Sequence, residues 1–433
     1  MEDPTYRLIS VFGFFILSGI AWITGTRSRI KIETIIGSIF LAWVLGALTF
    51  WVAWSRSALE WINDALIALL NASHKGSIFL FGPLALGPGQ AMPDGTASIG
   101  FVLAFQVFPS VIFFSALVGG LYHLGIMQKV VHLFSKAFYR ILSLSGAESL
   151  AASANIFVGI ESGLIVRPYL SKMTRSEFLT LMTCMMATVA STVMGIYVLA
   201  LQKIFPNIAG HLVSASLISI PCAILISKLF CPEQEHPETL GKPHEDKIEC
   251  PSKETSNLMT TLVEGGNQGV KMVVGIATVL IIVLGLEALF DLTLGKLPDL
   301  QGQPLSAVRL LGWLAYPFSM LLGLKPDEWE LTSQILGSRF IETEVSAYFA
   351  LASIQTTDAA LSLRSLTILT YALCGFVHIS SMGIFVGGLS ALVPSRAREI
   401  SVIGLQALWT SFLATLLTGC IAGSLVLSAN TSG

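Results

Sequence analysis

Long apolar runs recur along the chain and are separated by short polar segments. A helix needs roughly 20 apolar residues to cross the hydrocarbon core of a bilayer. Eight runs have about this length, at residues 6–25, 33–54, 98–122, 177–202, 209–230, 271–292, 365–391 and 400–427. The pattern therefore predicts an all-α polytopic membrane protein with eight transmembrane helices.

One further segment, residues 147–172, is apolar but interrupted. Gly159 and Gly163 flank a carboxylate, Glu161, and a carboxylate in such a place must face protein or a water-filled cavity. Basic residues lie on both sides of the segment: Lys129, Lys136, Arg140, Lys172 and Arg175. Because basic flanks favour the cytoplasm, both ends belong on that side, and the segment is predicted to be a re-entrant hairpin.

A second interrupted segment, residues 331–352, repeats this pattern, with Glu342 and Glu344 near its middle. If the segment is extended there, the two carboxylates share a face; if it is helical, they diverge. A span with a polar break follows each hairpin, at 188–192 and 378–381. Two opposed hairpins of this kind indicate an inverted repeat, with a binding site at the interface of the repeats near the bilayer midplane.

Charge and amphipathicity orient the chain. The first loop carries Arg27, Arg29 and Lys31 and is predicted to be cytoplasmic, which places both the N-terminus and the C-terminus outside. Residues 55–73 have apolar positions at helical spacing and predict an external interfacial helix. Glycines and prolines predict an external loop that ends near residue 327.

Composition narrows the class of protein. The 433 residues are 53% hydrophobic and only 12% charged, whereas soluble domains carry about 25% charged residues. A net charge of −2 does not indicate a nucleic-acid partner. The six cysteines form no CxxC pair and are expected in the core. The chain has no phosphate-binding GxxxxGK[ST] loop, so we expect a transporter driven by a gradient and no enzyme.

Several polar residues in apolar segments have two interpretations each. Glu161 and Glu344 are either structural carboxylates bonded to backbone N–H groups or functional ones, and intramembrane carboxylates are usually functional. Asn155 either caps a half-helix or offers its carbonyl oxygen to a cation. Thr188 and Ser191 either bond the i−4 carbonyl or act as ligands.

The polar break of the last broken span carries His378, Ser380 and Ser381. His378 is either a polar contact to a ligand, a protonatable group or a histidine bonded to a neighbouring helix. The hydrophilic run 231–257 is predicted to be a cytoplasmic linker, and its Cys231 and Cys250 are too far apart to suggest a metal site.

Five sequence motifs resemble the concentrative nucleoside transporter family, and the similarity runs through nearly the whole chain. They lie at residues 108–117, 145–159, 165–170, 374–376 and 379–388. The resemblance implies a homotrimer in a bacterial inner membrane, in which a transport core moves like an elevator against a scaffold. It also implies inward symport of nucleosides with sodium or protons.

Carried over residue by residue, the resemblance implies two sites. The nucleoside site comprises Gly159, Ile160, Glu161, Val193, Glu344, Phe376, His378 and Ser381. The sodium site uses side-chain or backbone oxygens of Asn155, Val158, Thr188 and Val189. Of the two carboxylates in the second hairpin, the resemblance matches Glu344, and not Glu342, to the one that binds ribose.

The chain departs from the family pattern at the substrate site. Ile160 stands where the family has a Gln-Thr pair beside the nucleobase, and the segment is one residue shorter. His378 stands where the family has an asparagine that bonds ribose. We expect altered nucleobase recognition with sodium as the coupling ion. The alternatives are proton coupling through His378 and Glu344, transport of a related non-nucleoside solute, and a non-transporting sensor.

The resemblance also divides the chain into scaffold and transport core. Residues 1–126 are scaffold helices with the external amphipathic helix, and 204–327 are scaffold helices with the linker. Residues 127–203 and 328–391 each supply one hairpin and the following broken helix to the core. Residues 392–433 form the C-terminal helix.

Overall fold

The computed structural model describes residues 4–87, 90–159, 161–205, 207–240, 257–298, 302, 304–357 and 360–426. Within these residues the regular structure is helical, apart from one isolated antiparallel bridge between Ala91 and Ala97. A helix satisfies its backbone groups internally, which is what apolar segments require in lipid.

Eight helical segments in the described part of the chain are long and apolar enough to cross a membrane. They are α1 (Pro4–Thr24), α2 (Ile32–Trp51), α3 (Ala53–Phe81) with η1 (Gly82–Ala85), α4 (Leu103–Gln106) with α5 (Phe108–His123), α10 (Arg175–Ala187) with α11 (Ser191–Leu201), α12 (Ile208–Phe230), α13 (Leu258–Leu294), and η3 (Pro394–Arg396) with α19 (Ala397–Leu425). The prediction of an all-α polytopic membrane protein is confirmed.

Two of the predicted boundaries differ from the structure. The helix expected at 55–73 is α3, which has 29 residues, because its buried positions continue at helical spacing beyond 73 to Ser77 and the helix runs through Gly76 to end at Gly82. The span expected at 365–391 is divided into α17 (Leu363–Ala372) and α18 (Ile379–Leu392) by the predicted polar break.

The external loop expected to reach residue 327 is wrong, because it contains α14 (Ala307–Leu321). The Ser306 side chain caps this helix by accepting a hydrogen bond from Arg309 N–H at 3.2 Å. Gly312 and Pro317 suggested a loop, yet Gly312 permits close contact with Gln334, and the helix contains Pro317. The predicted span 271–292 is part of a longer helix, α13, which begins at Leu258.

Both interrupted segments fold as helix–turn–helix hairpins. The first comprises α7 (Gly146–Ala154), α8 (Glu161–Ile165) and α9 (Arg167–Leu170), and the second comprises α15 (Trp329–Ser338) and α16 (Glu344–Ile354). Each hairpin is followed by a helix with a break, after Ala187 in α10–α11 and after Ala372 in α17–α18. The helix α6 (Ile126–Leu142) precedes the first hairpin, and η2 (Pro326–Glu328) precedes the second.

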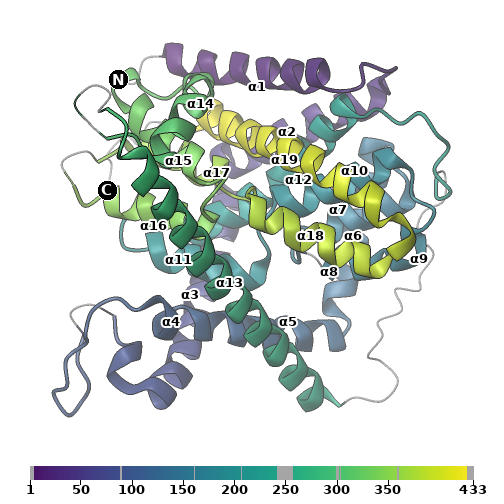
Figure 1. The fold of residues 1–433 in the computed structure, drawn as a ribbon. Helices are drawn as coiled ribbons and strands as arrows, with labels where there is room; N and C mark the ends of the chain where they lie inside the picture. The colour runs from purple at the N-terminus through teal and green to yellow at the C-terminus, as the bar shows by residue number, and fades with distance from the viewer. Residues whose placement is uncertain are drawn as a thin grey trace.

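The helices form a large buried bundle with a peripheral pair beside it. In the bundle, α12 and α19 are largely buried and contact each other, and α1 packs along α19 and α2 along α12. The pair consists of α5 and α13, which cross at the opposite edge of the molecule from α1 (Figure 1). Gly265 and Gly269 allow α13 to approach the backbone of α5 closely.

Candidate functional site

A cavity of about 410 Å³ lies between α11, α13, α16 and α18. Six of the residues predicted for the nucleoside site line it: Gly159, Val193, Glu344, Phe376, His378 and Ser381. They come from both hairpins and both broken helices, as expected for a site at the interface of two repeats. Most of the remaining wall is apolar, with Met272, Ile276 and Phe385 among its members.

Glu344 begins the second helix of the second hairpin. Thr343 is the N-cap residue of α16, and its side chain accepts a hydrogen bond from Ser346 N–H at 3.4 Å. A carboxylate in the first turn is favoured by the helix dipole. The side chain of Glu344 is buried, and Oε1 accepts a hydrogen bond from the Tyr197 hydroxyl at 2.8 Å.

His378 joins this carboxylate to the second broken helix. Its Nε2 lies 2.8 Å from Glu344 Oε2. Its Nδ1 accepts a hydrogen bond from Ser381 N–H at 3.1 Å and so caps α18. A nitrogen that accepts carries no proton, so the single ring proton of the neutral imidazole lies on Nε2, the nitrogen beside Glu344. The Ser381 hydroxyl donates to the carbonyls of Phe376 and His378.

Glu342 has a different position from Glu344. It belongs to the turn before α16, where its N–H donates to Ser338 O at 2.8 Å, and it is absent from the cavity wall. Because α16 begins at Glu344, the two carboxylates do not lie on one continuous helix, and only Glu344 reaches the cavity.

The first hairpin contributes less to the described cavity. Gly159 lies at its tip, where the N–H and hydroxyl of Ser162 both donate to Gly159 O. Ile160 lies outside the described residues, as does the side chain of Glu161, whose backbone opens α8. Val193 and Ala190 of the first broken helix complete this side of the wall with apolar surface.

The four residues predicted for the sodium site are buried: Asn155, Val158, Thr188 and Val189. Asn155 ends α7 and is fully buried, and both polar atoms of its amide lack a hydrogen-bond partner among the described residues. A buried unpaired amide is costly, and amide oxygens are typical ligands of hard cations. The residues therefore fit a cation better than the capping interpretation of the Asn155 side chain.

The two polar candidates at the first break make different bonds. The Thr188 hydroxyl donates to Cys184 O at 2.9 Å, which is the i−4 bond. Ser191 does not do so. Its hydroxyl and N–H donate to Phe157 O at 2.7 and 3.0 Å, and they attach the tip of the first hairpin to the start of α11.

Two charged residues near these sites were missed by the sequence analysis. Arg339 is fully buried at the tip of the second hairpin. Lys271 is exposed and lines the cavity from α13, and no ion pair joins it to a described residue. A basic residue at or inside an apolar segment could have indicated both. The same pattern also fits a side chain that extends to the membrane surface, so it did not single them out.

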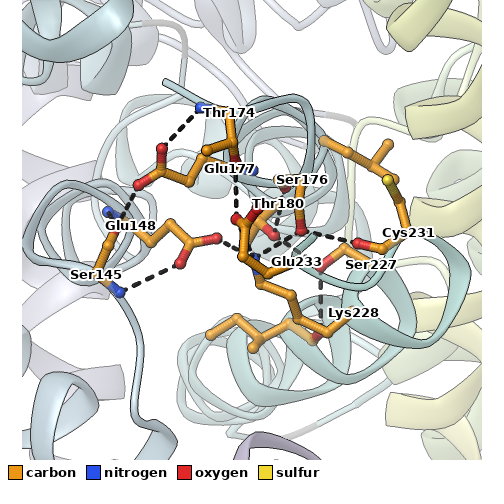
Figure 2. A network of polar contacts seen from close by, with 12 residues as sticks. Ser145, Glu148, Thr174, Ser176, Glu177, Thr180, Ser227, Lys228, Cys231 and Glu233 are labelled. Atoms are coloured by element: carbon orange, nitrogen blue, oxygen red, sulfur yellow. Dashed lines mark hydrogen bonds and ion pairs between the residues drawn. The ribbon is translucent and has the colours of Figure 1, made fainter. Parts of the chain in front are cut away.

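A buried polar network holds the first helix of the first hairpin (Figure 2). Glu148 and Glu177 close capping boxes at the starts of α7 and α10, and the Ser145 hydroxyl donates to Glu177. Lys228 of α12 forms an ion pair with Glu148 and donates to Ser176 Oγ at 2.9 Å. The network therefore connects the hairpin to α10 and α12.

The network corrects part of the linker prediction. Glu233 lies within the run 231–257, yet its side chain is only 4% exposed, because Thr174 donates to it at 2.7 Å and Lys228 lies 3.9 Å away. The start of this run is therefore packed. Residues 241–256, including Cys250, lie outside the described residues. The other five cysteines are buried and free, as expected.

Family models match nearly the whole chain in three parts. Residues 12–84 match the Na+ dependent nucleoside transporter N-terminus, and residues 211–423 match the Na+ dependent nucleoside transporter C-terminus. Residues 104–203 match a nucleoside recognition model named Gate.

Individual proteins agree with these matches. An uncharacterized transporter of Haemophilus influenzae is 32% identical over 428 residues, which are 96% of this chain and 97% of that protein. Sodium/nucleoside cotransporter 1 of Rattus norvegicus is 33% identical over 401 residues, which are 89% of this chain and 58% of the relative. The chain thus corresponds to a little over half of the rat protein's length.

Solved structures with the same fold include two of the protein CNTnw. Its inward-facing substrate-bound state has a TM-score of 0.87 at 30% identity and covers 97% of this chain and 98% of that chain. An outward-facing state of a doubly substituted CNTnw has a TM-score of 0.88 at 29% identity and covers 98% of both chains.

Proposed function

The chain belongs to the concentrative nucleoside transporter family, and from this premise we propose that it imports nucleosides together with a cation. It is a transporter and no enzyme. The observation that carries the proposal is the buried Asn155 amide, which has no hydrogen-bond partner among the described residues and lies a few residues before Gly159 of the cavity wall. A cation bound at the amide and a solute bound in the cavity would order the same short segment.

Ribose recognition is assigned to the second hairpin and the helix after it. Glu344 presents oxygens that only accept, and His378 Nε2–H is a donor directly beside them. Sugar hydroxyls donate and accept, so two adjacent ribose hydroxyls match this pair of groups. The hydrogen bonds to Tyr197 and Ser381 fix both side chains before a substrate arrives, which lowers the entropic cost of binding.

Nucleobase recognition is proposed to differ from the family pattern. Val193, Phe376 and Phe385 offer apolar and aromatic surface, on which any base can stack or pack. Among the described residues of the cavity wall, Lys271 carries a charge, as Glu344 does. Its ammonium group donates hydrogen bonds and accepts none. We therefore expect a preference for bases that present carbonyl oxygens.

Sodium is the proposed coupling ion. It would bind at the Asn155 side chain, the Thr188 hydroxyl and the backbone oxygens of Val158 and Val189, all at the first hairpin and the break that it contacts. Gly159 follows Val158 directly and lines the cavity. Ion and nucleoside would then raise each other's affinity, because each stabilises the same arrangement of the hairpin tip.

For the movement, we propose that residues 127–203 and 328–391 form the transport core, and that both hairpins are re-entrant. Residues 1–126 and 204–327 would form the scaffold of a homotrimer in the inner membrane, and the tight pairing of α5 with α13 within these segments supports this division. Lys228 and Glu148 face each other across this boundary. If a cross-link between α7 and α12 leaves uptake intact, the two helices move together, and α12 belongs to the transport core.

Uptake into proteoliposomes tests the proposal. Radiolabelled uridine, adenosine, cytidine and inosine would be offered with a sodium gradient and with a pH gradient, each imposed separately. We expect sodium-driven accumulation of at least one nucleoside. Folded protein that accumulates none of them would contradict the proposal.

The second candidate is transport of a related non-nucleoside solute, and Lys271 is the observation that favours it, because it suits an anionic solute. A thermal-shift panel of nucleosides, free bases, sugars and nucleotides separates the two candidates. Stabilisation by a non-nucleoside alone would favour the second.

A further inference from the structure

The two hairpins contact their broken helices through equivalent backbone bonds. At the first junction, the N–H of Ser191, which begins α11, donates to Phe157 O at 3.0 Å. At the second junction, the N–H of Ile379, which begins α18, donates to Phe340 O at 3.2 Å. In both, a phenylalanine carbonyl of the hairpin tip meets the first residue of the second half-helix.

This correspondence places Asn155 and Arg339 at equivalent positions. Asn155 is the C-cap residue of α7, and Arg339 is the C-cap residue of α15. Each ends the first helix of its hairpin, one or two residues before the phenylalanine. Both side chains are fully buried.

Arg339 is bonded to the end of the helix that precedes the second break. Its guanidinium donates to the carbonyls of Ala372, Leu373 and Gly375 and to the Thr415 hydroxyl. Ala372 is the last residue of α17, where backbone carbonyls lack helical partners and the dipole is negative. No carboxylate is among the hydrogen-bond partners of this guanidinium in the described chain, so backbone oxygens solvate the charge.

The first junction has no such cation of its own. Asn155 is neutral, and neither polar atom of its amide is bonded to any described group. Thr188 and Val189 directly follow the end of α10 at the first break, as Leu373 follows α17 at the second. The same backbone arrangement therefore has a covalently attached cation in one repeat and an unpaired amide in the other.

We propose that Arg339 is a tethered cation that does at the second junction what a bound sodium ion does at the first. Arg339 is a positioning residue: it holds the end of α17 against the hairpin from which Glu344 begins α16, and so it fixes the ribose side of the cavity. The second junction stays assembled throughout the cycle, and only the first responds to the ion. One sodium ion then suffices for each nucleoside. This inference rests on the proposed sodium site.

Replacing the arginine separates charge from volume. Arg339→Lys retains the cation, and Arg339→Gln retains much of the side chain without it. We expect Arg339→Lys to keep sodium-driven uptake and Arg339→Gln to lower nucleoside affinity about tenfold, within the usual range of coupling between sites. In Arg339→Gln, the freed carbonyls admit a second sodium ion, and the sodium dependence becomes steeper. Equal behaviour of the two variants would overturn the inference.

A binding measurement independent of transport completes the test. Arg339→Gly leaves a hole the size of the arginine side chain, which has room for a guanidinium ion, so added guanidinium should raise the melting temperature of this variant and leave the wild type unchanged. Arg364→Gly is the matched control, because Arg364 is also buried and donates to the carbonyls of Gly323 and Gly423, away from both junctions. In Arg364→Gly, guanidinium should leave the stabilisation by sodium unchanged. In Arg339→Gly, guanidinium should restore the stabilisation by sodium that the wild type shows.

The outcomes distinguish the inference from the proposed function. No guanidinium effect on a folded Arg339→Gly variant overturns the inference while sodium-driven uptake by the wild type stands. If Arg339→Gly does not fold, the comparison of lysine with glutamine decides. Absence of any stabilisation of the wild type by sodium contradicts the sodium site itself.

Discussion

The two hairpin junctions have the same backbone architecture but differ in what completes them. The second is completed by the chain, since Arg339 joins the tip to the end of α17, and His378 joins α18 to Glu344. The first contains a buried asparagine amide without a described partner. We infer that one repeat acts as a fixed template for the sugar while the other responds to an ion.

The same contrast extends to the two sides of the cavity. The second junction presents Glu344 and His378 already bonded to Tyr197 and Ser381. The first presents Gly159, Ala190 and Val193, which offer little hydrogen bonding from side chains. Selectivity for the sugar should therefore be strict and selectivity for the base loose.

The largest effect is expected from Glu344→Gln, which changes the proposed ribose site at the second junction. The amide has one acceptor oxygen where the carboxylate has two, so a donor replaces an acceptor beside Tyr197 or beside His378. Lost hydrogen bonds to a charged group cost about 1.5–3 kcal/mol, or roughly 10–150-fold in affinity. Initial uptake rates against nucleoside concentration measure this. Glu342→Gln is the matched control and should stay within about twofold. Equal losses in both variants would remove Glu344 from the site.

Asn155→Ala should disrupt the proposed sodium site at the first junction. Removing the amide oxygen takes away one ligand of the proposed ion, so its apparent affinity should fall at least about tenfold, and sodium should no longer stimulate uptake at concentrations that saturate the wild type. Asn63→Ala is the control, because Asn63 is also buried but accepts a hydrogen bond from Ala209 N–H at 3.2 Å. It should lower stability and leave sodium dependence intact. Unaltered sodium stimulation in Asn155→Ala contradicts the assignment.

His378→Asn tests whether the second junction carries protons. Asparagine is a good N-cap residue, so α18 should keep its start. We expect a several-fold weaker affinity for nucleosides, because one hydrogen bond of about 1 kcal/mol is weakened or lost. A sodium gradient should still drive uptake. Loss of a pH-gradient response that the wild type possesses would instead support proton coupling through this histidine.

Lys271→Met should have the smallest effect, confined to base preference. Uridine and cytidine differ in a carbonyl oxygen against an amino group, and one hydrogen bond of about 0.5–1.5 kcal/mol changes their affinity ratio roughly 2–10-fold. Competition of each nucleoside against labelled uptake measures the ratio. Lys296→Met, after the end of α13, is the control. A ratio unchanged by Lys271→Met would exclude the lysine from base recognition.

The sequence predicts those features that depend on local pattern. Apolar run lengths predict the long helices, and Gly159, Gly163 and the polar break at 378–381 predict the hairpins and divided helices. The helix α14 was missed, because glycine and proline punctuate it and only its packing on α15 explains it. Local pattern also missed the length of α3, because the polar residues 73–77 separate its amphipathic start from the apolar residues 78–81 at its end.

Features set by distant partners could not be predicted. Arg339 bonds residues 33 and 76 positions away, and Lys228 meets Glu148 from another helix. Without those partners, a basic residue in an apolar segment indicates only a side chain that extends to the surface. The placement of the cavity residues agrees with the resemblance, because the resemblance carries their spatial arrangement, which spacing alone does not. Their roles in transport stay predictions.

Uptake of labelled uridine by the wild type, measured at constant pH against sodium concentration, shows whether one junction binds an ion while the other does not. If one junction binds an ion and the other is held by Arg339, uptake requires sodium and follows a Hill coefficient of about 1. Uptake that ignores sodium would contradict ion coupling at the first junction. A coefficient of about 2 would contradict the tethered cation at the second.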